Sequence, residues 1–585
     1  RPPRRPPPRR RPALRLSDPM KRLNAGLLII AFILSLFAGR LVQLQAIKGK
    51  EYSEAAIKMR MRDIDLPARR GMIIDATGAP LAMTQDAFGI FADPTRIVAA
   101  RRDEIAARLA SVLGLNPADV LKNLTRPNTM YAELAHRVAP EQAKLIMSFK
   151  YAGIGTVPES RRVYPANAVA SNLIGFVNQA GDGGSGLEYQ ENKLLKGADG
   201  HQLVEIGRDG QHIPMGDGQT KKAVAGQGIQ LTINQDIQWK AEELLAAEVK
   251  KDKADWGTAV VMTPTGQVLA MASTPTFDPN RYSRASLDAL KNRVVQEPFE
   301  PGSTGKIVTA AALLERGLVT PESVFTVPYC LYKFTEKFCD SHPHKTQRLT
   351  FSGILSESSN TGTMLASERL SQDDIYGFLR AFGFGEKTGI DLPGETAGLL
   401  NPPDKWSGTD RWPISFGQTI SVSSLQMASV YATIANGGMR VPPTVIAGTY
   451  DGQGKFQPAA PPAARQVISP TTAHGLTSML EAVVNQGTGK SAKLPGYRVA
   501  GKTGTAERYD DKLHRYHGYT GMFAGFAPAD DPQVVVQVVV HNPQKDYYGG
   551  DVAAPVFREL MNFALQTQKV PPTGGTAPPL KLTAD

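Results

Sequence analysis

Three short motifs in the second half of the chain have the residue types and spacing of a serine acyl-transfer site. The only Ser-x-x-Lys among the 585 residues is Ser303-Thr304-Gly305-Lys306. The only Ser-x-Asn, Ser358-Ser359-Asn360, follows it, and Lys502-Thr503-Gly504-Thr505 comes last. A serine hydroxyl is a poor nucleophile until a neighbouring base takes its proton. Side chains three residues apart on a helix share one face, so a helix that starts at Ser303 places Lys306 beside it. The spacing predicts Ser303 as a nucleophile and Lys306 as its base.

The other two motifs supply the groups that such a nucleophile needs around it. Ser358 and Asn360 are small polar residues that can pass a proton and hold a substrate amide. A lysine and threonine hydroxyls can bind a terminal carboxylate, and a glycine lets a substrate backbone approach a strand closely. Backbone N–H groups of Ser303 and Thr505 would form the oxyanion hole. We therefore expect Ser303, Lys306, Ser358, Asn360 and Lys502 as catalytic residues and Thr503, Gly504 and Thr505 as substrate-binding residues.

Lys-Thr-Gly occurs a second time, at Lys387-Thr388-Gly389. This copy is enclosed by turn-forming glycine and proline, which indicates a surface loop. The copy at 502 carries an additional threonine and precedes two strand-like runs. We assign catalysis to Lys502 and a structural role to Lys387.

The elements that must position these motifs form a pattern of strands at both ends of a domain with helices between them. We place this domain at about residues 228–566. An antiparallel sheet covered by helices, in the α+β class, fits this order. The expected elements are strands 257–263, 267–272, 521–527 and 534–540, with the first two forming a hairpin, and helices 307–317 and 555–565.

Most of the positive charge lies at the N-terminus. Residues 1–22 carry nine Lys/Arg and one Asp, so they account for +8 of the formal net charge of +11. The rest of the chain is nearly balanced, and we expect no nucleic-acid partner. The segment 1–22 is too rich in proline to fold and is expected to be a solvated, disordered tail, although a specific binding arm is an alternative.

An apolar segment follows the basic tail directly. Residues 23–45 supply the roughly 20 apolar residues that span a bilayer if Arg40 reaches toward the interface. A cleaved signal peptide is the alternative, but no small-x-small cleavage site stands out after Gly39. The preceding arginines predict a single-pass anchor with a cytoplasmic N-terminus and an extracytoplasmic remainder.

The segments on either side of the catalytic region contain no catalytic constellation. Residues 50–225 mix short strands, turns and amphipathic helices, including a helix at 102–113, and are expected to form a pedestal that holds the catalytic domain away from the membrane. Residues 567–585 are rich in proline and glycine and are expected to be a disordered tail.

The two cysteines, Cys330 and Cys339, would both face an oxidising exterior. A disulfide is the favoured interpretation, with free thiols as the alternative. Because His342 and His344 follow closely, a zinc site must also be weighed, but Cys-x8-Cys-x2-His-x-His is not a usual ligand spacing. We expect no catalytic metal and no cofactor.

With these motifs in order, the chain resembles a class B penicillin-binding protein, a peptidoglycan D,D-transpeptidase, most like the septal type of actinobacteria. The resemblance extends over nearly the whole chain beyond the anchor. One departure is Thr419 after Gly417-Gln418, where the family commonly has glycine. Besides the three motifs, the segments that carry the resemblance are Arg70-Gly71, Arg162-Val163-Tyr164-Pro165, Gly186-Leu187-Glu188, Phe416-Gly417-Gln418 and Ile434-Ala435-Asn436-Gly437-Gly438.

The resemblance implies a penicillin-recognising fold, and an enzyme in which Ser303 is acylated by a D-Ala–D-Ala stem peptide, releases D-alanine and is resolved by a neighbouring amine. β-Lactams would acylate the same serine. A multi-spanning septal glycosyltransferase and divisome membrane proteins would be partners. The alternatives are a D,D-carboxypeptidase, a β-lactamase, and a membrane-anchored β-lactam sensor or division scaffold. The chain has no Glu-x-x-Leu-Asn segment to place a deacylating water, which disfavours the β-lactamase.

Overall fold

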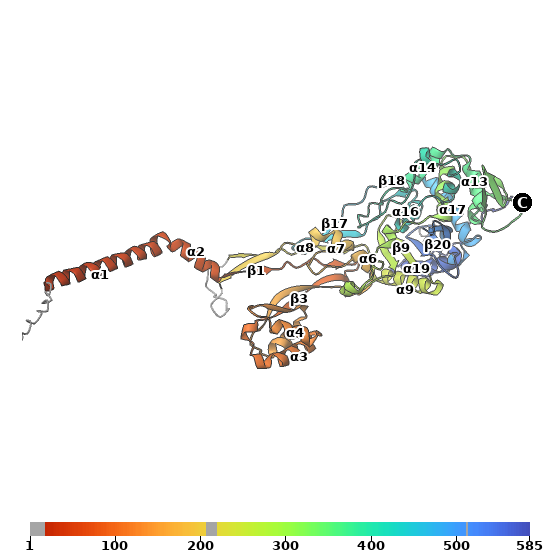
Figure 1. Ribbon diagram of the computed structural model, residues 1–585. Coiled ribbons are helices and arrows are strands. Elements are labelled where there is room, and N and C mark those ends of the chain that lie inside the picture. Colours follow the sequence, from red (N-terminus) through yellow and green to blue (C-terminus); the bar gives the residue numbers. More distant parts are fainter. Residues whose placement is uncertain (1–17, 206–218, 511–512, 585) are drawn as a thin grey trace, which may run out of the picture. The chain divides into compact units, whose positions relative to one another are not determined.

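The computed structural model describes residues 18–205, 219–510 and 513–584 (Figure 1). Most of the predicted tail at 1–22 lies outside these residues.

The chain divides into two compact units. The smaller contains the chain up to Leu66 together with Asp199–Ala223, and the larger contains Pro67–Ala198 and everything from Val224 onward. All three sequence motifs belong to the larger unit. The predicted pedestal at 50–225 is shared between both units, and its boundaries with the predicted catalytic domain at 228–566 stay predictions.

A five-stranded antiparallel sheet lies at the centre of the larger unit. Its strand order is β10-β9-β21-β20-β19, and every neighbouring pair is antiparallel. The predicted hairpin and both late strands are confirmed. The strands are β9 (Trp256–Met262), β10 (Val268–Thr274), β19 (Ala500–Asp510), β20 (Arg515–Ala527) and β21 (Val534–His541).

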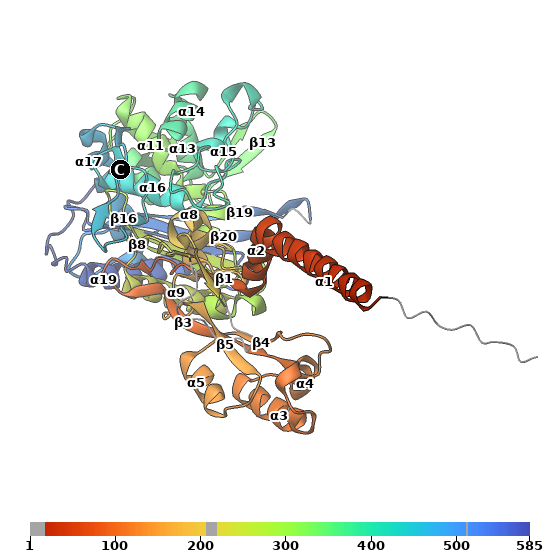
Figure 2. The ribbon, with the colours of Figure 1, turned by 90° about the vertical axis from the view of Figure 1, so that its left-hand side faces the viewer.

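Helices cover both faces of this sheet, as the sequence predicted (Figures 1 and 2). Side chains alternate between the two faces of a strand. Val536 and Val538 of β21 therefore pack with the helices of one face, while Val535 and Val539 pack with those of the other. Burial on both sides favours apolar residues, which explains the valines that lie on either side of the buried Gln537 in this strand. The helices are α9 (Gln235–Asp252) and α19 (Ala554–Thr567) on one face and α16 (Ser424–Ala435) on the other, and α11 (Lys306–Glu315) belongs to the same core as α16.

A second sheet joins the early and late parts of the larger unit. Its order is β17-β16-β8-β2-β3-β4, and β5 also pairs with β3. β8 is parallel to β2 and antiparallel to β16, so a strand that precedes the three motifs is hydrogen-bonded to a strand that lies between the second motif and the third. The strands are β2 (Ile73–Ile74), β3 (Pro80–Ala92), β4 (Ala132–Val138), β5 (Ile154–Val163), β8 (Gly228–Leu231), β16 (Ile446–Tyr450) and β17 (Phe456–Pro458).

Three helices form a small core of their own against β3, β4 and β5 (Figure 2). They are α3 (Arg102–Leu113), α4 (Pro117–Leu124) and α5 (Pro140–Ser148). α3 confirms the helix predicted at 102–113, and Gly114 ends it in a left-handed conformation with φ of 68°.

A buried ion-pair network joins three of the segments on which the resemblance rests. Arg70 Nε donates to Glu188 Oε2 at 2.6 Å, and Arg162 Nε donates to Glu188 Oε1 at 2.7 Å. The hydroxyl of Tyr164 donates to the same oxygen at 3.3 Å. Glu188 is fully buried. Two guanidinium groups compensate its desolvation, so removal of both would leave an uncompensated buried charge.

The smaller unit contains the candidate membrane anchor. α1 (Pro19–Val42) continues through a short π-helix (Gln43–Ile47), and together they are long and apolar enough to cross a membrane. This helix includes the predicted anchor at 23–45. A helix, α2 (Gly49–Arg60), follows, and a three-stranded sheet is formed by β1 (Met61–Leu66), β6 (Gly200–Glu205) and β7 (Gln219–Lys221).

The end of the chain differs from the predicted disordered tail at 567–585. Leu580 packs against the main core. Thr350 N donates to Leu582 O and Ala584 N donates to Arg348 O, both at 3.0 Å. Backbone pairing with an existing strand edge needs no helix propensity, so a proline-rich tail can dock in this way. The tail therefore supports the element that leads into the Ser-x-Asn motif.

Candidate active site

Ser303 lies on a tight turn immediately before α11. A 3₁₀ turn (Gly302–Thr304) carries it, and the α-helix begins only at Lys306 and ends at Glu315 before Gly317. The helix predicted at 307–317 is confirmed, but Ser303 lies on the 3₁₀ turn before it and not at the start of the α-helix itself. Gly302 N donates to Gly417 O at 2.8 Å. A Cβ on Gly417 would lie 2.1 Å from Gly302 O, so only glycine fits there.

The amino group of Lys306 is buried beside the second motif. Lys306 is 1% exposed, and its Nζ donates to Ser358 O at 2.5 Å and to Asn360 Oδ1 at 2.7 Å. Burial lowers the pKa of Lys306 to about 7, while the carboxylate of Asp340 acts in the opposite direction. A lysine with this pKa can be a neutral base near neutral pH.

Lys502 reaches the same turn from the sheet. It is fully buried on β19, and its Nζ donates to Ser358 Oγ at 2.7 Å and to Thr503 O at 3.1 Å. Burial and then the charge of Lys306 lower the pKa of Lys502 well below its ordinary value. The predicted residues Lys306, Ser358, Asn360 and Lys502 are thus brought together.

Ser358 serves both lysines because of an unusual backbone conformation. It lies between α12 (Phe351–Ser356) and α13 (Asn360–Ser367), with φ of 58°. Few residues other than glycine adopt this left-handed conformation. Here the carbonyl oxygen of Ser358 faces one amino group and the hydroxyl faces the other.

Ser303, the predicted nucleophile, makes no such contact. Among the hydrogen bonds of the described residues, none involves the Ser303 hydroxyl, which is half-buried. Catalytic hydrogen bonds are often formed only when substrate binds, so this absence does not argue against the prediction.

The three predicted substrate-binding residues lie on β19. Thr503 Oγ1 is 2.7 Å from Thr488 Oγ1, and Thr505 Oγ1 accepts from Gly549 N at 3.0 Å. A Cβ on Gly504 would lie 2.6 Å from Met522 Cγ and 2.9 Å from Thr304 Cγ2. The structure therefore explains why residue 504 is glycine, and this explanation differs from the predicted close approach of substrate. Glycine allows the turn that carries Ser303 to pack against the strand.

The second Lys-Thr-Gly lies in a loop. Lys387 is exposed, and Thr388 donates from its backbone N and from Oγ1 to Glu395 Oε1 at 2.7 and 2.5 Å. The two hydrogen bonds from Thr388 thus stabilise a loop, in agreement with the structural role assigned to this copy.

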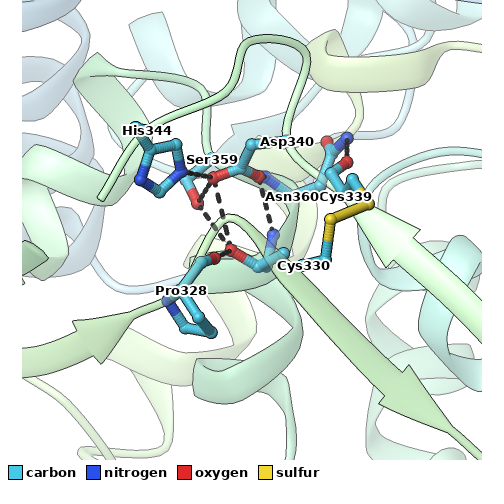
Figure 3. The surroundings of a disulfide bond; sticks show 8 residues. Pro328, Cys330, Cys339, Asp340, His344, Ser359 and Asn360 are labelled. Atoms are coloured by element: carbon cyan, nitrogen blue, oxygen red, sulfur yellow. Dashed lines mark hydrogen bonds and ion pairs between the residues drawn. A yellow bond between two sulfur atoms is a disulfide. The ribbon is translucent and has the colours of Figure 1, made fainter. Parts of the chain in front are cut away.

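The cysteines form a disulfide between two short paired strands, β12 (Cys330–Lys333) and β13 (Glu336–Cys339) (Figure 3). This is the favoured interpretation of the sequence, and it removes both thiolates from any zinc site. No group of three or more metal-ligating side chains occurs among the described residues.

Two groups near the site carry no motif and were missed by the sequence analysis. The buried hydroxyl of Tyr431 on α16 donates to Thr304 O at 3.0 Å. Asp340, directly after the disulfide, accepts from Asn360 N at 2.5 Å. Only the structure shows that these residues, distant in sequence, support the turns of Ser303 and Asn360.

Thr419, the departure from the family pattern, has a physical consequence. Its side chain is exposed and its φ is 59°. A β-branched residue is strained in this left-handed conformation, in which glycine is not.

We expect Thr419→Gly to raise the free energy of unfolding by about 1 kcal/mol, because relief of the strain exceeds the extra entropy of glycine in the unfolded chain. Thermal unfolding of the purified protein measures it. Thr419→Ala keeps the Cβ and is the control. A melting temperature of Thr419→Gly at or below that of Thr419→Ala would contradict the interpretation.

Comparison with known proteins agrees with this geometry. Residues 257–562 match the family described as penicillin binding protein transpeptidase domain, and residues 65–231 match the penicillin-binding protein dimerisation domain. Penicillin-binding protein PbpB of Mycolicibacterium smegmatis is 36% identical, over 98% of this chain and 94% of its own length. Peptidoglycan D,D-transpeptidase FtsI of Escherichia coli is 33% identical, over 93% of this chain and 91% of its own.

Solved structures give the same assignment. The crystal structure of penicillin binding protein 3 from Mycobacterium tuberculosis, complexed with aztreonam, has a TM-score of 0.71 and 32% sequence identity, and the match covers 89% of this chain and all of that one. A peptidoglycan synthetase from Bifidobacterium adolescentis has a TM-score of 0.72 and 29% identity, with coverage of 90% of this chain and all of that one. The chain belongs to the class B penicillin-binding proteins, which combine a dimerisation domain with a transpeptidase domain.

Proposed function

We propose that Ser303 is the nucleophile of this peptidoglycan D,D-transpeptidase and that Lys306 is its general base. The observation that carries the proposal is the buried amino group of Lys306, which lies one helical turn from Ser303 and has a pKa lowered to about 7. A neutral amine at this position can take the serine proton as the hydroxyl attacks.

In the acylation step, Ser303 Oγ bonds to the carbonyl carbon of the penultimate D-alanine of the donor, and its proton passes to Lys306. The bond to the terminal D-alanine breaks, and its nitrogen takes a proton from the hydroxyl of Ser358. Lys502 donates to Ser358 Oγ, which leaves the proton of that hydroxyl free to be given away. The proton held by Lys306 then replaces it, so that D-alanine leaves as the neutral amine.

In the second step, the amine of a neighbouring stem peptide attacks the acyl-enzyme ester. Its nitrogen loses a proton as the amide forms, and Ser303 recovers one as the ester breaks. Asn360 would hold the donor amide, and Thr503, Gly504 and Thr505 would bind the donor along β19. β-Lactams would acylate Ser303 in place of the donor. Structures of the similar Mycobacterium tuberculosis protein with aztreonam and ampicillin support this inference.

The N-terminal helix and the names of the relatives support the cellular setting that we propose. A role at the division septum is consistent with the names PbpB and FtsI. The arginines before α1 favour a cytoplasmic N-terminus and an extracytoplasmic catalytic domain. The partners we propose are a multi-spanning septal glycosyltransferase and divisome membrane proteins, which the family resemblance implies.

Intact-mass analysis after treatment with penicillin tests the nucleophile. We expect a stable adduct of one drug molecule on the wild-type protein and none on Ser303→Ala, because the variant lacks the attacking hydroxyl. Ser283→Ala, a change at an exposed serine, is the control and should form the adduct. An adduct that persists in Ser303→Ala would contradict the assignment.

The pH dependence of acylation tests the base. The neutral fraction of Lys306 increases as the pH rises through its pKa of about 7, so the acylation rate should increase from about pH 6 to pH 8 and then level off. Lys306→Arg stays charged throughout, and its rate should fall by about 100-fold or more at every pH. A wild-type rate that decreases over this range would exclude Lys306 as the base.

A further inference from the structure

The carboxylate of Asp340 accepts hydrogen bonds from two backbone N–H groups and two hydroxyl groups of the Ser359-Asn360-Thr361 turn (Figure 3). Its Oδ1 accepts from Asn360 N at 2.5 Å and from Thr361 N at 2.9 Å. Its Oδ2 accepts from Ser359 Oγ at 2.7 Å and from Thr361 Oγ1 at 3.2 Å, and it lies 3.0 Å from His344 Nε2. The Asp340 side chain is 9% exposed, so these bonds are largely shielded from water.

These bonds complete the N-terminus of α13. The first N–H groups of a helix have no partner within the helix. Ser359 Oγ accepts from Gly362 N at 2.9 Å, and Asp340 accepts from the two N–H groups that remain before it, those of Asn360 and Thr361. A negative charge at this end of a helix is also favourable. The backbone of Asn360 is thereby fixed from outside its own helix.

The residue before Asp340 fixes the side chain of Asn360. Asn360 Nδ2 donates to the backbone carbonyl of Cys339 at 3.1 Å, and Asn360 Oδ1 accepts from Lys306 Nζ at 2.7 Å. A carbonyl oxygen can only accept a hydrogen bond, so the amide nitrogen of Asn360 must face Cys339 and its amide oxygen must face Lys306. The disulfide to Cys330 holds this carbonyl in place across the paired strands.

We propose that Asp340 and the backbone carbonyl of disulfide-bonded Cys339 are positioning groups for the catalytic base: together they orient Asn360 so that its amide oxygen faces Lys306. This inference rests on the proposed roles of Ser303 and Lys306. Neither Asp340 nor Cys339 needs to touch substrate, because both act through Asn360.

The same carboxylate influences Lys306 through its charge. Burial lowers the pKa of Lys306, and Asp340 opposes this effect. The other charged groups around the paired lysines are Lys502 on β19 and Glu357 at the end of α12. Removal of the Asp340 charge should therefore lower the pKa of Lys306 further. A purely structural helix cap would not produce this shift.

The loop after Asp340 also reaches residues beside β19. The rings of His342 and Tyr548 are 5.5 Å apart. Tyr548 precedes Gly549, whose N–H donates to Thr505 Oγ1. The disulfide-anchored segment thus contacts a residue next to a partner of the third motif as well as the second motif itself.

Substitutions at Asp340 test the proposal in the full-length protein in detergent. The measurement is the second-order rate constant for acylation by penicillin, followed by intact mass from about pH 5.5 to pH 9. Asp340→Ala should lower this constant by about 10- to 100-fold, because Asn360 and Lys306 lose their fixed geometry. Asp340→Asn keeps an oxygen for the two N–H groups, so its loss should be smaller, and its pH profile should move to lower pH.

Asp93→Ala is the matched control, since Asp93 caps a short helix in the dimerisation half by accepting from Thr95 N. It should be acylated at the same rate as the wild type.

If Asp340→Ala fails to fold, the pH profile of Asp340→Asn decides the question. Rate and profile unchanged in a folded Asp340 variant would overturn this inference while leaving the proposed function intact. A wild-type protein without an adduct on Ser303 would overturn the proposed function first.

Reduction of the disulfide tests the contribution of Cys339. The chain contains two cysteines, so a phosphine reductant acts on this one bond. We expect reduction to slow the acylation step by about 3- to 10-fold with little change in the affinity for penicillin, because the Cys339 carbonyl becomes less well placed. The Cys330→Ser/Cys339→Ser variant should be equally slow and insensitive to reductant. Equal rates of oxidised and fully reduced wild-type protein would overturn the role of the disulfide.

Discussion

Two lysine amino groups buried against one serine are the constraint on which the active site depends. Lys306 and Lys502 are both almost completely inaccessible to solvent, and both donate to Ser358. Burial disfavours the charged form of each, and the charge of Lys306 further disfavours that of Lys502. The pKa of Lys306, lowered to about 7, suits proton transfer near neutral pH. Such a pair is tolerated only if every N–H has an acceptor nearby, which the carbonyl and hydroxyl of Ser358, the carbonyl of Thr503 and the amide of Asn360 provide.

The sheet and the serine turn are held together by residues without side chains. Gly504 lies against Thr304 and Met522, and Gly417 lies against the backbone of Gly302. Larger residues at these positions would separate the turn that carries Ser303 from the strand that carries Lys502. The valines of β21, packed on both faces, make the sheet a fixed reference for this contact. The position of Ser303 is therefore set by close backbone packing rather than by hydrogen bonds of its own hydroxyl.

Patterns of neighbouring residues predicted much of this arrangement. Short strand-like runs of apolar residues located β9, β10, β20 and β21, and the motif spacing identified the residues that converge on Ser358. The sequence contains no comparable signal for contacts between distant segments. The bonds from Asn360 and Thr361 to Asp340 span about 20 residues and join a hairpin to a helix, so no local pattern marks them. The left-handed conformation of Ser358 and the docked C-terminus were missed for the same reason, because tertiary contacts determine both.

Those distant contacts explain why a strained serine persists at the centre of the site. A left-handed conformation costs a residue other than glycine roughly 1–2 kcal/mol and is retained only where the surroundings leave no alternative. Asp340 holds the chain after Ser358. Before it, the C-terminal segment binds Thr350 at the start of α12, and Thr488 N donates to Ser356 O at 3.3 Å near its end. With both flanking helices fixed by separate parts of the fold, the connecting turn has little freedom left. Ser358 then presents its carbonyl to one lysine and its hydroxyl to the other, and the fold supplies the free energy that this conformation requires.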